Sequence, residues 1–155
     1  MFCLVCDRVR MIRESTNPYF IYELETGYVV LGDHQHFYGY TLFLLKDHIA
    51  ELHQIPKETR LKHLEELSLV YEAVFNAFKP EKMNCELLGN GAAHVHWHLF
   101  PRRPGDTPEK GPVWWLPKEE MYGDEKKPSA AELEQMKEIL KREIERLIIK
   151  GEASI

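Results

Sequence analysis

The chain has 155 residues, enough for one ordinary domain with a single hydrophobic core. Its composition, 44% hydrophobic and 29% charged, is that of a folded globular protein and argues against intrinsic disorder. A formal net charge of -5 does not suit sequence-independent nucleic-acid binding, and no apolar run approaches the ~20 residues of a membrane span. We therefore expect neither nucleic acid nor a membrane as a partner.

The cysteines favour a cytoplasmic location. There are three, an odd number, and no signal peptide is expected because Asp7 and Arg8 directly follow the short apolar start. A disulfide framework is therefore not expected. Cys3 and Cys6 form a C-x-x-C pair that suggests metal or redox chemistry, whereas Cys85 is expected in the core.

The first half of the chain predicts three strands and a long helix. Residues 19–24, 28–32 and 40–45 are apolar runs of strand length, the first two separated by a Thr26-Gly27 turn. A helix is expected from Pro56 to Phe78, ending at Lys79-Pro80. The apolar residues expected to form its core-facing stripe are Leu61, Leu64, Leu67, Tyr71, Val74 and Phe78.

The second half predicts two strands, a loop and another helix. Residues 82–88 and 94–100 are strand-like and are joined by the turn Gly89-Asn90-Gly91. Residues 106–128 belong to a proline-rich stretch and are expected to form an irregular, functional loop. The final helix, expected over 129–150, has an apolar stripe made of Leu133, Met136, Leu140, Ile144, Leu147 and Ile148.

These elements predict one α+β domain over residues 1–155, with a core at 1–105. A capping box, in which Ser129 is followed three residues later by Glu132, marks the start of the last helix.

The most informative segment is 94–99, where histidine alternates with an apolar residue. Alternate side chains of a strand lie on the same face. We therefore expect His94, His96 and His98 in one row on an accessible face, with the apolar residues facing the core.

Three roles for this row stay open. A single metal ion is one, although the outer two Cα atoms of such a strand lie ~13 Å apart, so three imidazoles would converge awkwardly. Nucleophilic and acid–base chemistry on a phosphate is the second, because adjacent imidazoles can orient one another. In the third, the histidines lie on a solvated strand and have no chemical role.

The chain resembles the histidine-triad (HIT) family of nucleotide hydrolases and transferases. The similarity covers roughly residues 1–105 and does not extend into the tail. The segments that carry it are the histidine segment His94–Arg102, the strand Gly39–Leu42 that leads to Lys46-Asp47-His48, the strand and turn Asn84–Asn90, and the pair Cys3-x-x-Cys6.

The resemblance implies a mechanism at the α-phosphorus of a nucleotide. His96, the middle histidine, would attack and form a covalent nucleotidyl-histidine, which water or another acceptor resolves. His98 would donate to the non-bridging or leaving oxygens, and His94 completes the triad. This agrees with the ability of a flanked imidazole to be held in one tautomer with its reacting nitrogen free.

Nucleotide-binding roles are carried over to three further residues. Asp33 aligns with the family residue that binds ribose hydroxyls, the Asn90 amide can donate to phosphate, and the Arg102 guanidinium can form a fork with phosphate. The alternatives are turn residues for Asp33 and Asn90 and a solvated loop arginine for Arg102.

In some branches of the family, the cysteine pair binds a structural zinc ion. The ligand set here would be Cys3, Cys6, His48 and His94, and two thiolates with two imidazoles match a closed structural site. Such a site would also orient the catalytic strand. No organic cofactor is expected.

The family fold implies an antiparallel sheet of about five strands, with the long helix packed on it and a C-terminal helix, in a homodimer with a composite sheet. The chain departs from the family pattern at Leu45, where proline is usual before Lys-x-His, and at Tyr40, where several relatives have another active-site histidine. Trp114-Trp115 in the loop would be exposed unless it contacts a partner or covers the site. The remaining histidines, expected at the surface or as caps, are His34, His36, His53 and His63.

Hydrolysis of dinucleoside polyphosphates such as diadenosine tetraphosphate is the leading function, because the sequence from Leu88 to His98 most resembles that bacterial branch. A phosphoramidase that releases adenylate from lysine adducts is the second candidate. A nucleotide-binding regulatory module with little turnover and a purely zinc-dependent structural domain are candidates of other classes.

Overall fold

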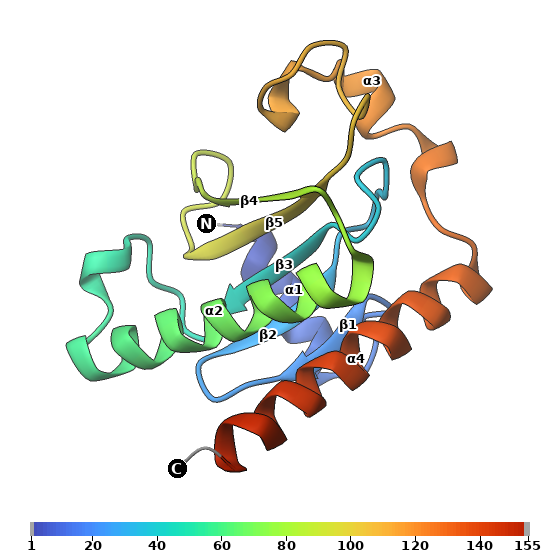
Figure 1. The fold of residues 1–155 in the computed structure, drawn as a ribbon. Coiled ribbons are helices and arrows are strands. Elements are labelled where there is room, and N and C mark those ends of the chain that lie inside the picture. Colours follow the sequence, from blue (N-terminus) through green and yellow to red (C-terminus); the bar gives the residue numbers. More distant parts are fainter. Residues whose placement is uncertain (1, 154–155) are drawn as a thin grey trace.

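The structure, a computed structural model, describes residues 2–153; Met1 and residues 154–155 of the predicted domain lie outside this range. Its centre is a five-stranded antiparallel sheet with the strand order β1-β2-β3-β5-β4 (Figure 1). This confirms the predicted α+β fold and antiparallel sheet. The strands are β1 (Phe20–Glu23), β2 (Gly27–Leu31), β3 (Thr41–Leu45), β4 (Lys82–Leu87) and β5 (His96–Arg102).

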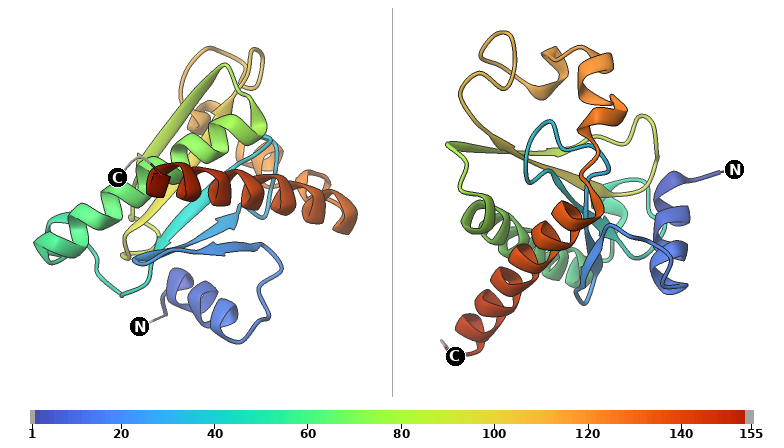
Figure 2. Two further views of the ribbon diagram at one scale, coloured as in Figure 1. Left: turned by 60° about the horizontal axis from the view of Figure 1, so that its bottom comes forward. Right: turned by 90° about the vertical axis from the view of Figure 1, so that its right-hand side faces the viewer.

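Two long helices, α2 (Lys57–Phe78) and α4 (Ala130–Ala153), cover one face of the sheet (Figure 2). Lys79 ends α2 in a left-handed conformation, with φ of 50°. The capping box is confirmed, since Ser129 Oγ accepts from the Glu132 backbone N–H at 3.2 Å and the Glu132 carboxylate accepts from that of Ser129 at 2.8 Å. The predicted apolar stripe of the last helix packs into the main core.

The predicted stripe of α2 is partly wrong. Leu61 and Leu64 are 58% and 36% exposed, whereas His63 and Glu66 are buried. The helix is therefore rotated so that a polar pair, and not two leucines, faces the sheet near its N-terminus. His63, predicted to be a surface or capping residue, is fully buried because it hydrogen-bonds both to Trp97 and to the β1–β2 turn.

A helix that was not predicted, α1 (Leu4–Arg13), covers the other face of the sheet (Figure 2). Its buried residues Val5, Val9 and Ile12 recur at helical spacing and pack on β2 and β3. That spacing is the signal in the sequence that identifies this helix.

The segment between β5 and α4 contains only short helical turns: η2 (Val113–Trp115), α3 (Lys118–Met121) and η3 (Asp124–Lys126). Another short turn, η1 (Leu52–Gln54), precedes α2. The segment is anchored by buried residues of its own, which pack on Phe37 and on Phe100 of β5. None of the helices within residues 2–153 is long and apolar enough to cross a membrane.

Candidate active site and metal centre

The three histidines of the predicted row do not share one strand face. β5 begins at His96, so only His96 and His98 lie on it, with ring centroids 4.9 Å apart. His94 lies in the preceding loop and its ring faces the N-terminal cysteines. The expected row is therefore wrong at its first member. The reason is that the Val95 backbone N–H donates to the Ile49 carbonyl, 2.8 Å away, outside the sheet ladder.

The backbone of the loop fixes the tautomer of His96. Its Nδ1 lies 2.6 Å from the carbonyl oxygen of His94. A carbonyl oxygen only accepts hydrogen bonds, so Nδ1 carries the hydrogen, and Nε2 of the neutral ring keeps its lone pair. His96 is buried at 8% exposure, yet it lines a cavity, so this free nitrogen belongs to a site that can admit a ligand.

Tyr40 holds the neighbouring His98. The Tyr40 hydroxyl lies 2.6 Å from Nδ1 of His98, and the two rings are stacked with Phe100. Burial, and then the nearby His96, lower the pKa of His98 to about 4, so this imidazole is neutral at pH 7. Burial raises the pKa of the Tyr40 phenol, which therefore keeps its proton and can donate it to His98 in a hydrogen bond.

A cavity of about 290 Å³ lies beside the two histidines. Its walls come from α1, β2, β3 and the segment before α4, and they are mostly apolar, as in many small-molecule sites. Its polar groups include Arg8 and Asp33, which form an ion pair at 2.6 Å. His96 and His98 form one wall of the cavity.

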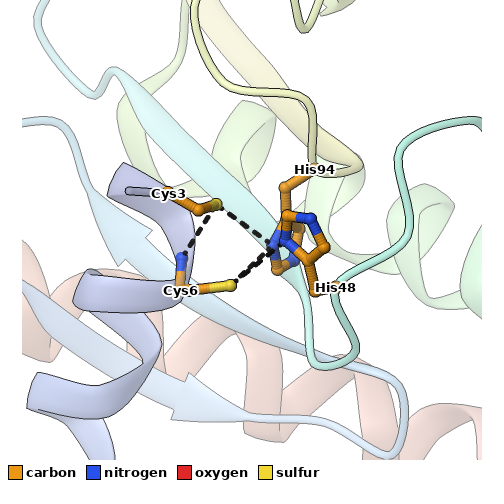
Figure 3. Close-up of side chains that lie close together, drawn as sticks. All are labelled: Cys3, Cys6, His48 and His94. Atoms are coloured by element: carbon orange, nitrogen blue, oxygen red, sulfur yellow. Dashed lines mark hydrogen bonds between the residues drawn. The ribbon is translucent and has the colours of Figure 1, made fainter. Parts of the chain in front are cut away.

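A second cluster gathers the predicted metal ligands. One nitrogen or sulfur atom from each of Cys3, Cys6, His48 and His94 lies within 4.8 Å of the others (Figure 3). The Cys6 sulfur is 3.2 Å from Nδ1 of His48 and 3.5 Å from Nδ1 of His94, and the Cys3 sulfur is 3.7 Å from the latter. α1 supplies the cysteines, because Cys3 is its N-cap and Cys6 lies in its first turn.

A hydrogen bond to the backbone on one side of the His94 ring directs the other ring nitrogen toward the cluster. Nε2 lies 2.7 Å from the Leu45 carbonyl and must donate to it, so Nδ1 presents a lone pair to the sulfur atoms. Burial lowers the pKa of His94, which favours this neutral form. Burial and then the Cys3 side chain raise the pKa of the Cys6 thiol. A cation among four such donors would offset the cost of the thiolate charge.

Comparison with known proteins places this site in a family. The sequence pattern of the HIT domain matches residues 13–105, which is more than half of the chain. The chain belongs to the HIT domain family. A search of curated proteins found no match.

Solved structures with the same fold include other HIT proteins. A hypothetical histidine triad nucleotide-binding protein from Sulfolobus tokodaii is 23% identical, with 92% of this chain and 93% of that chain covered and a TM-score of 0.69. A histidine triad protein from Bradyrhizobium japonicum is 23% identical, with coverage of 81% and 89% and a TM-score of 0.71. A zinc-bound histidine triad family protein from Mycobacterium smegmatis is 21% identical, with coverage of 96% and 96% and a TM-score of 0.65.

The HIT domain brings only some of the predicted nucleotide-binding residues together. Asp33 lies in the cavity with the histidines. Asn90 is exposed in the loop before the triad, and the cavity is bordered there by Ala92 instead. Arg102 lies at the far end of β5, where both sides of its guanidinium bond to Asp106, at 2.8 Å.

Residues outside the matched part of the HIT domain also border the cavity. Arg8 comes from α1, and Met121 and Tyr122 come from the segment before α4. The edge of the Tyr122 ring meets His34, with centroids 5.6 Å apart. No local motif in the sequence marks these three residues, and only the folded chain brings them to the site.

Proposed function

We propose that this protein hydrolyses or transfers nucleotides at the α-phosphorus, through a covalent nucleotidyl-histidine on His96. The observation that carries the proposal is the 2.6 Å hydrogen bond from Nδ1 of His96 to the His94 carbonyl, which leaves Nε2 as a lone pair beside the cavity. An imidazole held in one tautomer and facing a ligand site is suited to nucleophilic attack. Membership of the HIT domain family supports the same reaction.

The reaction has two displacement steps. Nε2 of His96 attacks the α-phosphorus, a nitrogen–phosphorus bond forms, and the bond from phosphorus to the leaving group breaks. Water then attacks the same phosphorus, which releases a nucleoside monophosphate and returns the lone pair to Nε2, while the water loses its proton to the solvent. The positioning of the phosphate supplies most of the catalysis in such displacements.

His98 stabilises the charge that develops on the phosphate oxygens. When the Tyr40 hydroxyl donates to Nδ1 of His98, the hydrogen of the neutral ring is on Nε2. Within residues 2–153 no protein hydrogen bond is found for Nε2 of His98, so its N–H is available to a phosphate or leaving oxygen. His98 is the next residue after His96 on the same face of β5. Tyr40 thus serves in place of the histidine that several relatives have at this position.

Dinucleoside polyphosphates, with diadenosine tetraphosphate as the type compound, are the proposed substrates. The sequence resemblance from Leu88 to His98 supports this class. The low pKa of His98 supports this class as well. A neutral imidazole can donate a hydrogen bond to a leaving oxygen, but it does not readily transfer a proton to it. A nucleotide leaves the α-phosphorus as an anion without a proton, whereas the amine of a phosphoramidate needs one.

The cysteine–histidine cluster is proposed to hold a structural zinc ion. Two sulfur atoms and two imidazole nitrogens, with the lone pair of His94 already turned toward them, match the donor set of a closed zinc site. Zinc would supply no step of the reaction there. The cluster would join α1 to the loop that contains His94, whose carbonyl oxygen fixes the tautomer of His96.

The test is product analysis of the wild-type protein and two variants, His96→Ala and His53→Ala. His53 is exposed in η1 and provides the matched control. The substrates are diadenosine tetraphosphate, an adenylated lysine and a nucleotide sugar. We expect turnover of the dinucleotide, a loss of at least about 1,000-fold in His96→Ala and little change in His53→Ala. Acid-labile nucleotide on the quenched protein would identify the covalent intermediate.

Other outcomes of this assay point to other functions. Preferential turnover of the adenylated lysine would establish the phosphoramidase. Nucleotide binding without turnover of any substrate would overturn the enzymatic proposal in favour of the regulatory module. By family resemblance we also propose a homodimer, which sedimentation equilibrium would test by its mass.

A further inference from the structure

Trp114 lies beside the histidine pair, on the opposite side from the cavity that His96 and His98 line. Its ring meets His98 and Phe100 nearly edge-on, at 87° and 88°, with centroids 6.3 Å and 6.0 Å away. Its indole N–H donates to the Glu86 carboxylate on β4, at 2.9 Å. The cavity instead lies against α1, β2 and β3. Because β5 lies between β3 and β4, the two catalytic histidines separate the cavity from Trp114.

The position of Trp114 is held, although its side chain is exposed. Trp114 is 44% exposed, whereas Val113 at the start of η2 and Leu116 just after it are 0% and 5% exposed and fix the segment to the core. The Arg102 guanidinium donates to the Gly111 carbonyl at 2.7 Å and so fixes the chain just before η2. A large aromatic ring, held by a buried anchor and one hydrogen bond next to the reacting groups, is a preformed surface for stacking.

We propose that Trp114 is a specificity-determining residue that stacks on the base of the leaving nucleotide. This inference rests on the proposed function and extends it. With one nucleoside in the cavity and its α-phosphate at His96, the rest of a dinucleotide must leave across His98, toward β4. There the second base meets the indole. The Arg102 guanidinium near this end of β5 is already paired with Asp106, so stacking, and not charge, binds the second nucleoside.

Glu86 has a positioning role in this arrangement. It is the cross-strand neighbour of His98, and its carboxylate accepts the indole N–H, which keeps Trp114 beside the histidine. Glu86→Gln retains an oxygen that can accept this hydrogen bond, whereas Glu86→Ala removes it. The two variants therefore separate the placement of the indole from the charge of the carboxylate.

The experiment compares diadenosine tetraphosphate with adenosine 5′-tetraphosphate, which has the same polyphosphate chain but lacks the second adenosine. We expect Trp114→Ala to lower kcat/KM for the dinucleotide by about 10- to 100-fold, mainly through KM, and to change that of the mononucleotide by less than about twofold. Trp114→Phe and Glu86→Gln should retain most of the selectivity. Glu86→Ala should lose part of it.

The matched control is Trp115→Ala. Trp115 lies in the same turn and is 54% exposed, but its ring packs over Gly111. We expect unchanged selectivity in this variant. Equal losses for both substrates in Trp114→Ala, or no loss for either, would overturn the inference while His96-dependent turnover of the wild type still supported the proposed function. A wild-type protein that hydrolyses neither substrate would overturn both.

Discussion

Trp97 donates its indole N–H to Nε2 of His63, 3.0 Å away, on the face of the sheet opposite His96 and His98. The same imidazole bonds through Nδ1 to the Thr26 hydroxyl at 2.7 Å, and that hydroxyl bonds to the Glu66 carboxylate. Because Nε2 of His63 accepts, its hydrogen must be on Nδ1, and the chain of bonds has one direction, from Trp97 to Glu66. It ties the strand that contains His96 to α2 and to the β1–β2 turn.

The buried network around His63 should make the folded protein less stable as the pH falls. Burial lowers the pKa of His63 to about 4 from its usual 6.5, so the unfolded chain binds more protons than the folded protein between these values. The stability that His63 provides is complete above pH 6.5 and is lost as the pH falls through this range, by about 3 kcal/mol in total. His98 contributes in the same direction and window.

Urea unfolding at pH 7.5 and pH 5 checks this prediction in the wild type, His63→Gln and the exposed control His53→Gln. The drop in the free energy of unfolding between the two pH values should be smaller in His63→Gln than in the other two proteins. An equal drop in all three would show that His63 does not provide the pH dependence.

Removing the Tyr40 hydroxyl should impair catalysis with little effect on the fold. Tyr40→Phe keeps the ring stacked on Phe100 but leaves His98 without its partner at Nδ1, so both tautomers of His98 become populated. We expect a decrease in kcat of about 10-fold or more and a small change in KM. Tyr38→Phe is the control, because Tyr38 is exposed and its ring meets Phe78 instead of His98. Equal kcat values for the wild type and Tyr40→Phe would refute the positioning role.

The proposed zinc site predicts one metal ion per chain. Cys6→Ala should abolish zinc binding, as measured by atomic absorption, and should lower Tm by about 4–8 °C if the ion contributes about 2 kcal/mol. Cys85→Ala should keep its zinc, because Cys85 lies on β4 and outside the cluster. Zinc content at or near zero in the wild-type protein purified without chelator would contradict the proposal.

The ion pair between Arg8 and Asp33 predicts a role for α1 in nucleotide binding. Arg8 holds the carboxylate of Asp33, the proposed ribose ligand, inside the cavity. We expect Arg8→Ala to weaken adenosine monophosphate binding by about 3- to 10-fold, as measured by calorimetry. Arg10→Ala is the control, because Arg10 pairs with Asp7 and Glu14 on the outer side of the same helix. Unchanged affinity for adenosine monophosphate in Arg8→Ala would show that Arg8 does not contribute to nucleotide binding.

The sequence by itself determined most of the secondary structure and the identity of the chemical groups. Apolar runs, the Ser129–Glu132 capping box and the stop at Lys79-Pro80 are local signals, and each acts within a few residues of the chain. The alternation of histidine with apolar residues correctly placed Trp97 and Leu99 toward the core. The resemblance to the HIT family also named all four members of the cysteine–histidine cluster.

Only the tertiary structure decided where these groups point. The backbone bond between Val95 and Ile49 takes His94 off the strand and turns it to the cysteines, and α2 rotates to bury His63 where leucines were expected. Arg8 and Trp114 reach the site from segments that are far apart in the sequence. These outcomes depend on hydrogen bonds and packing between residues that are far apart in sequence, which no local pattern encodes.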